Sequence, residues 1–337
     1  DLGVGASTKL SVTLNDPEGD AMAVTFYGRK TTPATAGPDF SFIAVPDTQF
    51  YSENTGHNAS GGSSGAVIGL FNAQTQWMVD NRNTRNIAFV SHMGDIVQNG
   101  DTYQQEWINA DGAMKKIESQ TATLRAYGIP WGGAPGNHDF GTGGGTGTTS
   151  FYNQYFGTSR WAGRNYYGGN FGTNNNSNYE LFSASGLDFI VLHLEYNAGA
   201  VSSYQAMLDW ADALLKAHPN RRAIVTSHWI VNTGNPATFS TQGQAIYDNL
   251  KDNPNLFLML CGHVNGEGRR SDVFNGRTVY SILQDYQDIT DGGKGFLRAF
   301  TFSPASNQIT VESYSPTLDR AVQAGDSVPS WTTTYTL

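Results

Sequence analysis

The sequence of 337 residues has one cysteine, few charged side chains and no long apolar run. The single cysteine, Cys261, excludes an intramolecular disulfide. No segment reaches the roughly 18 apolar residues that a membrane helix needs, so we expect no membrane span. Basic residues are also scarce, since 20 Lys and Arg stand against 29 Asp and Glu, for a net charge of −9. This acidity argues against nucleic-acid or anionic-membrane partners, which require a basic face.

Charged residues make up only 15% of the chain, whereas glycine is frequent, with 39 residues. Few charges combined with many small and amide side chains are more typical of an extracellular or periplasmic protein than of a cytosolic one, so we expect a secreted protein. The chain is long enough to bury a large core. No sequence feature indicates self-association, and we therefore expect a monomer.

Residues 1–38 differ in pattern from the rest of the chain. Segments 8–15 and 21–29 alternate apolar and polar residues around the turn sequence DPEGD, which predicts a β-hairpin. Such a hairpin cannot bury a core alone. It is either the end of an upstream β-module or a hairpin docked on the main domain, and the composition of 31–39 indicates a linker. We place the main domain at residues 39–337.

From residue 40 on, short apolar strands alternate with amphipathic helices, which is typical of an α/β fold. We predict strands at 40–45, 87–93, 129–134, 187–196, 221–229 and 256–263. We predict helices at 71–82, 103–128, 202–218 and 242–250. The last part of the chain is rich in strand-like segments, so we expect the sheet to continue antiparallel at its edge or as a second sheet.

Five of the apolar strands end in side chains with oxygen or imidazole donors. These are Asp47 and Gln49, His92 and Asp95, the run Asn137, His138 and Asp139, then His228, and finally His263 and Asn265. One histidine at a strand end is usually a hydrogen-bonded structural residue, but ligands in α/β sheets bind at the carboxyl ends of strands. Five such ends together predict a site for a hard or borderline divalent ion, because buried charges need a partner or a metal.

The order Asp-x-Gln, Gly-Asp, Gly-Asn-His-Asp, His, Gly-His-x-Asn resembles the calcineurin-like metallophosphoesterases over about residues 40–315. Gly-Asp and Gly-Asn-His-Asp match that family literally, and "PDTQ" at the first motif is similar to a secreted bacterial branch. The family has histidine where this chain has Gln49 and Asn265. The resemblance implies a four-layer α/β/β/α sandwich of two mixed β-sheets flanked by helices.

The resemblance also implies two divalent ions, drawn from Mn, Mg, Ca, Zn and Fe. Their ligands, carried over by position, would be Asp47, Gln49, Asp95 and Asn265 for metal 1, and Asp95, Asn137, His228 and His263 for metal 2. Both amide substitutions fall on metal 1. We therefore expect either a hard, oxygen-bound ion or no ion there, and Zn, Fe or Mn at metal 2.

The function implied is that of a metal-dependent phosphoesterase acting on a small phosphomonoester or phosphodiester by attack of a metal-bridging hydroxide. His138 would assist at the phosphate or leaving group, with Asp139 orienting its ring. The expected substrate contacts are Asn137, His138, His92, Tyr51 and Trp229. Two alternatives stay open: a phosphate- or glycan-binding module with weak or no turnover, and hydrolysis at a non-phosphorus centre.

Overall fold

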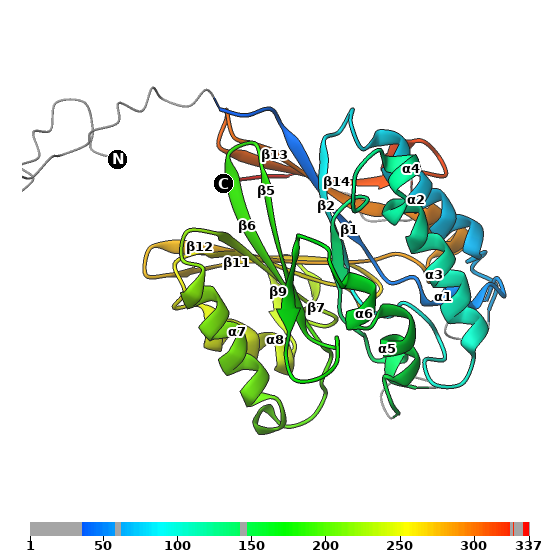
Figure 1. The fold of residues 1–337 in the computed structure, drawn as a ribbon, viewed down its shortest axis with the longest axis horizontal. Helices are drawn as coiled ribbons and strands as arrows, with labels where there is room; N and C mark the ends of the chain where they lie inside the picture. Colours follow the sequence, from blue (N-terminus) through cyan, green and yellow to red (C-terminus); the bar gives the residue numbers. More distant parts are fainter. Residues whose placement is uncertain (1–35, 58–61, 142–146, 324–325, 327–332, 337) are drawn as a thin grey trace, which may run out of the picture. The chain divides into compact units, whose positions relative to one another are not determined.

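The apolar segments predicted as strands form the centre of two β-sheets, which Figure 1 shows between two sets of helices. The computed structural model describes residues 36–57, 62–141, 147–323, 326 and 333–336. From Ala36 on, the chain forms one compact unit. The hairpin predicted at 8–29 lies outside the described residues.

The first sheet combines a parallel part with an antiparallel part. Strands β1, β2 and β3 are parallel, whereas β13 pairs antiparallel with the other edge of β1. The strands in spatial order are β15 (Arg320–Ala321), β14 (Gln308–Ser315), β13 (Leu297–Ser303), β1 (Phe40–Val45), β2 (Ile87–His92) and β3 (Trp131–Gly133), with β16 (Thr333–Thr336) also on β14.

The second sheet has a parallel centre made of β6, β7, β10 and β12, flanked by antiparallel strands. In spatial order its strands are β4 (Tyr167–Asn170), β5 (Asn178–Ala184), β6 (Leu187–Leu194), β7 (Arg222–Ser227), β10 (Leu256–Cys261), β12 (Arg277–Asp285), β11 (Gly266–Phe274), β8 (Val231–Gly234) and β9 (Ala237–Phe239).

Helices cover the outer faces of the two sheets. In Figure 1, α2 and α3 lie on the side of the first sheet and α7 and α8 on the side of the second. The α-helices are α1 (Gln49–Glu53), α2 (Ile68–Asn81), α3 (Gln104–Glu118), α4 (Gln120–Thr123), α5 (Ser150–Phe156), α6 (Thr158–Trp161), α7 (Gln205–Ala217) and α8 (Thr241–Leu250). Three 3₁₀ turns span His138–Phe140, Val201–Ser203 and Thr290–Gly295. Among the described residues, no helix combines the length and apolar character needed to cross a membrane.

The central strands are apolar on both faces because each face packs against a different layer. In β1, Phe40 and Phe42 join the core between the two sheets, while Ile43 and Val45 join the core beneath α2 and α3. Side chains alternate between the faces of a strand, so a continuous apolar run fills both cores. The predicted α/β/β/α sandwich of two mixed sheets is confirmed.

Two local predictions differ from the structure. The helix predicted over 103–128 is divided at Ser119, whose extended backbone ends α3 and whose Oγ accepts a hydrogen bond from Ala122 N to begin α4. In addition, the late strands were expected to continue antiparallel at the edge or as a second sheet, and β12 does pair antiparallel with β11, but on its other side it is parallel to β10. The second difference places one more strand end near the predicted metal site.

Candidate metal centre

The residues predicted to form a metal site converge from the carboxyl ends of strands in both sheets. Asp47 follows β1 and Asp95 follows β2, while His228 follows β7 and His263 follows β10. The backbone amide of His263 donates to Asp47 Oδ2 at 3.0 Å, and His228 Nε2 lies 3.1 Å from Asp95 Oδ2. The parallel strands of the two sheets therefore end at one shared site.

The Nε2 atom of His228 lies at the centre of this arrangement. His228 Nδ1 lies 3.1 Å from the carbonyl oxygen of Met93, to which it donates, so in the neutral ring Nε2 carries a lone pair. That atom faces Asn137 Oδ1 at 2.9 Å, His263 Nδ1 at 3.0 Å and the Asp95 carboxylate at 3.1 Å. A cation satisfies several converging acceptors at once, whereas one shared hydrogen cannot.

The charges of this cluster act strongly on one another. Ligand atoms of Asp95, His228 and His263 all lie within 4.8 Å of one another. Burial lowers the pKa of His228, but the Asp95 charge and its hydrogen bond outweigh burial, and the pKa lies above its ordinary value. Burial and the charge of His228 lower the pKa of His263 to about 4, which keeps that ring neutral and able to bind a metal.

Asp47 and Gln49 supply buried oxygen atoms beside this cluster. The Asp47 side chain is 1% exposed, and its pKa lies well above the ordinary value because of burial and the nearby charges of Asp285 and Asp95. Gln49 is 6% exposed, and its Oε1 has no hydrogen-bond partner among the described residues. A buried amide oxygen without a donor, next to a carboxylate, fits a cation.

Two glycines allow the backbone to approach these carboxylates closely. A Cβ on Gly262 would come within 1.8 Å of Asp47 Oδ1, and a Cβ on Gly136 within 2.2 Å of Asp95 Oδ1. Any larger residue at these positions would displace the carboxylate. The glycines of the Gly-His and Gly-Asn-His motifs are therefore part of the site.

The two amides expected at metal 1 lie in different surroundings. Gln49 begins α1 and is buried, whereas Asn265 is exposed on the turn between β10 and β11. In this turn His263 and Gly266 both have positive φ, at 75° and 115°. The expectation that both amides lie at the same ion therefore has structural support for Gln49 alone.

His138 and Asp139 are adjacent in sequence but have separate roles in the structure. The Asp139 carboxylate accepts hydrogen bonds from the backbone amides of Ile96, Val97 and Gly136 at 2.8–3.1 Å. The ring of His138 instead pairs through Nδ1 with the carbonyl oxygen of Gln98 at 3.1 Å. The expectation that Asp139 orients the His138 ring is therefore corrected: Asp139 joins the loops that follow β2 and β3.

Two of the expected substrate contacts are closed to solvent. Tyr51 is 0% exposed and its hydroxyl donates to the Gly292 carbonyl, and His92 is 1% exposed with Nε2 3.0 Å from Thr48 Oγ1. In this structure neither side chain is open to a substrate, contrary to expectation. Trp229 is only half-buried, and its ring centroid lies 4.6 Å from that of His263.

The structure adds two residues that the sequence reasoning missed. Tyr196 follows β6, and its ring centroid lies 5.8 Å from the centroids of both His228 and His263. Asp285 ends β12, and its carboxylate affects the pKa of Asp47. The sequence did show a strand that ends in the carboxylate of Asp285. However, an antiparallel strand would have placed this carboxylate at the edge of the sheet opposite to the metal centre.

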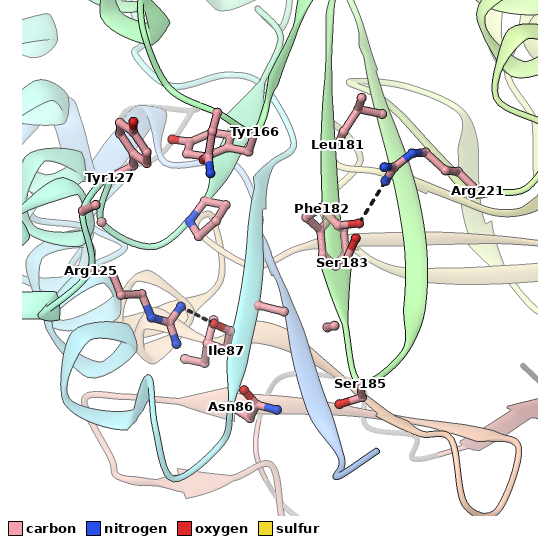
Figure 2. A pocket seen from close by; sticks show the side chains of 16 residues that line it. Asn86, Ile87, Arg125, Tyr127, Tyr166, Leu181, Phe182, Ser183, Ser185 and Arg221 are labelled. Carbon is pink, nitrogen blue, oxygen red and sulfur yellow. Dashed lines mark hydrogen bonds between the residues drawn. The ribbon is translucent and has the colours of Figure 1, made fainter. Parts of the chain in front are cut away.

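A cavity of about 820 Å³ lies apart from the metal centre, and none of the predicted site residues lines it. Its lining includes Ile87, the first residue of β2, and Arg221, the residue before β7. The cavity therefore lies at the amino ends of these strands, whereas the metal centre lies at their carboxyl ends. Figure 2 shows Arg125 and Arg221 on the two sides of this cavity, each with a guanidinium directed to a backbone carbonyl oxygen. Both arginines therefore have structural partners.

Comparisons with known proteins agree with this geometry. The family model for calcineurin-like phosphoesterases matches residues 40–289. The chain belongs to this family. This calcineurin-like phosphoesterase is 32% identical over 286 residues to the uncharacterized protein YvnB of Bacillus subtilis (strain 168). The match covers 82% of this chain but 20% of YvnB, so the chain spans about a fifth of the relative's length.

Solved structures resemble this calcineurin-like phosphoesterase in fold. A dimetal phosphatase from Danio rerio is 14% identical with a TM-score of 0.52, and the match covers 89% of this chain and 99% of that one. GAP50, the anchor in the inner membrane complex of Plasmodium, is 11% identical with a TM-score of 0.50, covering 89% of each chain. At these identities the likeness concerns the fold alone.

Proposed function

We propose that this chain is a dinuclear metal-dependent phosphoesterase that hydrolyses a phosphomonoester or phosphodiester of a small molecule. The observation that carries the proposal is the convergence of Asp95, Asn137 and His263 on the Nε2 atom of His228. Membership of the calcineurin-like phosphoesterase family supports the same reaction class.

The donor set fits two ions of different character. Asp95, Asn137, His228 and His263 would hold one ion through mixed nitrogen and oxygen donors, which suits Zn, Fe or Mn. Asp47, Gln49 and Asp95, with Asn265 as the fourth donor expected from the sequence, would offer the other ion oxygen alone, which suits Mg, Mn or Ca. Bound together, two divalent ions would activate water and offset the phosphate's negative charge.

His138 is placed to handle a proton beside this site. Its backbone amide donates to Asp95 Oδ1 at 2.8 Å, which fixes the residue next to the cluster. Its Nδ1 donates to the Gln98 carbonyl oxygen, and the half-buried ring therefore keeps Nε2 for the substrate. In its protonated form Nε2–H would donate to the leaving oxygen, the role of a general acid.

Two aromatic rings provide a flat apolar surface next to the same site. Trp229 and Tyr196 both lie against His263, with ring centroids at 4.6 and 5.8 Å. Their half-buried rings would contact a leaving group bound beside the phosphate, so we infer that planar leaving groups are favoured over small aliphatic ones. Trp229 remains a proposed substrate contact on this basis.

The test is hydrolysis of p-nitrophenyl phosphate and its bis ester by protein loaded with Mn²⁺. His138→Ala should lower kcat by about 100-fold or more, the usual contribution of general acid catalysis. The matched control is His57→Ala, because His57 is exposed and lies outside the metal cluster. Absence of turnover with any of Mn²⁺, Mg²⁺, Ca²⁺, Zn²⁺ and Fe²⁺ would refute the proposal.

One observation favours the alternative of a phosphate- or glycan-binding module. Asn265 is exposed, so a metal 1 site that depended on it would bind its ion weakly. Protein that holds metal and binds phosphate in calorimetry without any turnover would establish this alternative. We also propose that the chain acts outside the cytosol, because its low charged fraction of 15% is typical of secreted proteins.

A further inference from the structure

Asp285 is a buried carboxylate at the end of β12 (Arg277–Asp285) with an unsatisfied oxygen. Its side chain is 4% exposed, and Oδ1 has no hydrogen-bond partner among the described residues. The carboxylate accepts one hydrogen bond, from the backbone amide of Gln287. Burying a carboxylate oxygen without a donor is costly unless a cation compensates it.

Strand pairing places Asp285 beside the turn that carries His263. In the parallel pair of β10 and β12, Cys261 lies opposite Leu283, so His263 and Asp285 each lie two residues beyond the same register position. In the antiparallel pair of β11 and β12, Asp285 lies opposite Gly266, the residue after Asn265. Both neighbouring strands therefore hold Asp285 at the edge of the metal centre.

Asp285 interacts with charges on both sides of the centre. Its charge raises the pKa of Asp47, and its own pKa responds to the charges of His228 and Asp95. The strand pairing gives the side that it faces, because the turn beside Asp285 is the one whose His263 amide donates to Asp47 Oδ2 at 3.0 Å. Asp285 lies outside the compact group of Asp95, His228 and His263. Within the described residues, no ion pair with lysine or arginine involves Asp47 or Asp285. Two buried carboxylates in one cluster are stabilised by a proton at low pH, whereas at neutral pH and above a bound cation would stabilise both in their ionised form.

We propose that Asp285 is a ligand of metal 1, where it takes the position expected of Asn265. The inference rests on the dinuclear centre of the proposed function. Metal 1 would then be bound by Asp47, Gln49, Asp95 and Asp285, all through oxygen. Three carboxylates and one amide oxygen favour a hard divalent ion such as Mn²⁺, Mg²⁺ or Ca²⁺, and disfavour softer ions that prefer nitrogen or sulfur.

The added carboxylate also changes the charge of the centre. Asp47, Asp95 and Asp285 contribute −3, against +4 from two divalent ions. An exposed amide such as Asn265 would hold the ion by a neutral oxygen on a turn, whereas Asp285 adds a full charge from a paired strand. A ligand held on paired strands is better fixed than one on a turn, which favours metal binding.

The test measures Mn²⁺ binding by titration calorimetry and the melting temperature with and without Mn²⁺. Asp285→Asn keeps the shape but removes the charge, so the weaker of two Mn²⁺ sites should lose affinity by about tenfold or more, while the tighter site is retained. The rise in melting temperature caused by Mn²⁺ should shrink. The metal-free variant should be at least as stable as wild type, because a buried like charge is gone.

Two further variants keep the inference testable if Asp285→Asn does not fold. Asn265→Ala should leave both Mn²⁺ affinities unchanged, because Asn265 is exposed. Asp285→Glu should retain two sites. Asp272→Asn is the charge-matched control in the same hairpin, since Asp272 pairs with Arg270 on β11, and it should change neither affinity.

Three outcomes overturn the inference: unchanged affinities in Asp285→Asn, a loss of the weak site in Asn265→Ala, or a single Mn²⁺ site in the wild type. A purely structural Asp285 would lower the melting temperatures of metal-free and metal-loaded protein equally. Two bound ions without turnover of any phosphoester would refute the proposed function and leave the role of Asp285 intact.

Discussion

At the residue scale, the metal centre depends on how closely the backbone approaches its carboxylates. Gly262 lies so near Asp47 that a Cβ atom would fall 1.8 Å from Oδ1, well inside van der Waals contact. The same residue precedes His263, whose amide binds Asp47. One position thus sets the distance between Asp47 and His263, the residues proposed to bind metal 1 and metal 2.

Gly262→Ala should therefore disable metal binding while leaving most of the fold in place. The added methyl group has to displace Asp47 or the His263 turn, so we expect a loss of at least about tenfold in Mn²⁺ affinity, comparable to disturbing a ligand's support. Calorimetric titration and far-UV circular dichroism measure the two effects. Wild-type affinity in this variant would contradict the geometry.

The control is Gly112→Ala in α3, where an added Cβ meets nothing within 4 Å. Alanine is about 0.5–1 kcal/mol more favourable than glycine inside a helix. The control variant should therefore be slightly more stable to denaturant and bind Mn²⁺ as wild type does.

The sequence predicts the role of a residue well where the residue belongs to a contiguous motif. It predicts the role poorly where that role depends on whether the side chain is buried. Asp95, Asn137 and His263 were recognised because each follows a short apolar strand in a recurring pattern. Tyr51 and Asp139 were misread because the sequence does not show that one is covered completely or that the other binds three backbone amides.

At the scale of secondary-structure elements, many of the side chains packed between the two sheets are aromatic. Phe189 on β6 stacks on Phe182 with ring centroids 4.7 Å apart, and it meets the edges of Phe40 and Phe302 from the first sheet at 5.7 and 5.5 Å. These rings fill the layer between the sheets. They hold together the two sets of strand ends that form the metal centre.

Phe189→Ala should lower the free energy of unfolding by about 3–5 kcal/mol, the usual cost of removing a buried phenyl ring. Val273→Ala is the control, because Val273 is 72% exposed on β11, and should change stability by no more than about 0.5 kcal/mol. Urea unfolding of metal-free protein measures both. A cost near that of the control would show that the sheets do not depend on this contact.

The positions of the strands in the parallel core were predicted correctly. The direction of a strand relative to its neighbours was not predicted where it depends on which strands pair. The strand predicted at 40–45 matches β1, because a run buried on both faces has a clear sequence pattern. β12 forms an antiparallel hairpin with β11, but it also pairs parallel with the more distant β10, and periodicity carries no information about that second partner. Asp285 escaped notice for this reason.

At the scale of the whole molecule, buried carboxylates give the metal-free protein an unusual pH dependence. Burial, together with the charge of Asp95, raises the pKa values of Asp139 and Asp285 to about 7, and burial also raises the pKa of Asp47 well above its ordinary value. Ordinary values are near 4. A carboxyl with a raised pKa contributes stability below about pH 4 and loses it as the pH rises through the raised value.

We therefore expect metal-free protein to be less stable at pH 8 than at pH 6.5. The raised pKa of His228 acts in the same direction, and the lowered pKa of Asp95 costs stability only at lower pH, outside this range. The pKa values of His92 and His263, lowered to about 3 and 4, oppose the trend only below about pH 6.5, where the unfolded histidines become protonated. Mn²⁺ should reverse the trend, because the ion favours the ionised carboxylates. Melting temperatures from pH 6.5 to 8, with EDTA or with Mn²⁺, test this. A metal-free melting temperature that rises over this range would contradict it.

Alternating strands and helices predicted an α/β fold, and the four layers of the architecture were implied by the resemblance to the calcineurin-like metallophosphoesterases. The N-terminal hairpin predicted at 8–29 stays a prediction. The five polar strand ends predicted a shared site, but which ends lie in direct contact was not predictable locally, because no sequence signal reports that Asp47 and His263 meet.

The contact between Asp47 and the His263 amide joins residues 216 positions apart. During synthesis, a ribosome-bound chain therefore has no complete site until the strand ending at Asp285 has emerged and paired. In the proposed centre the ion would be acquired only once these strands have paired, from whatever supply surrounds the chain at that moment. For a chain exported before folding, the metal content of the destination compartment, and not that of the cytosol, would decide which ions the site takes up.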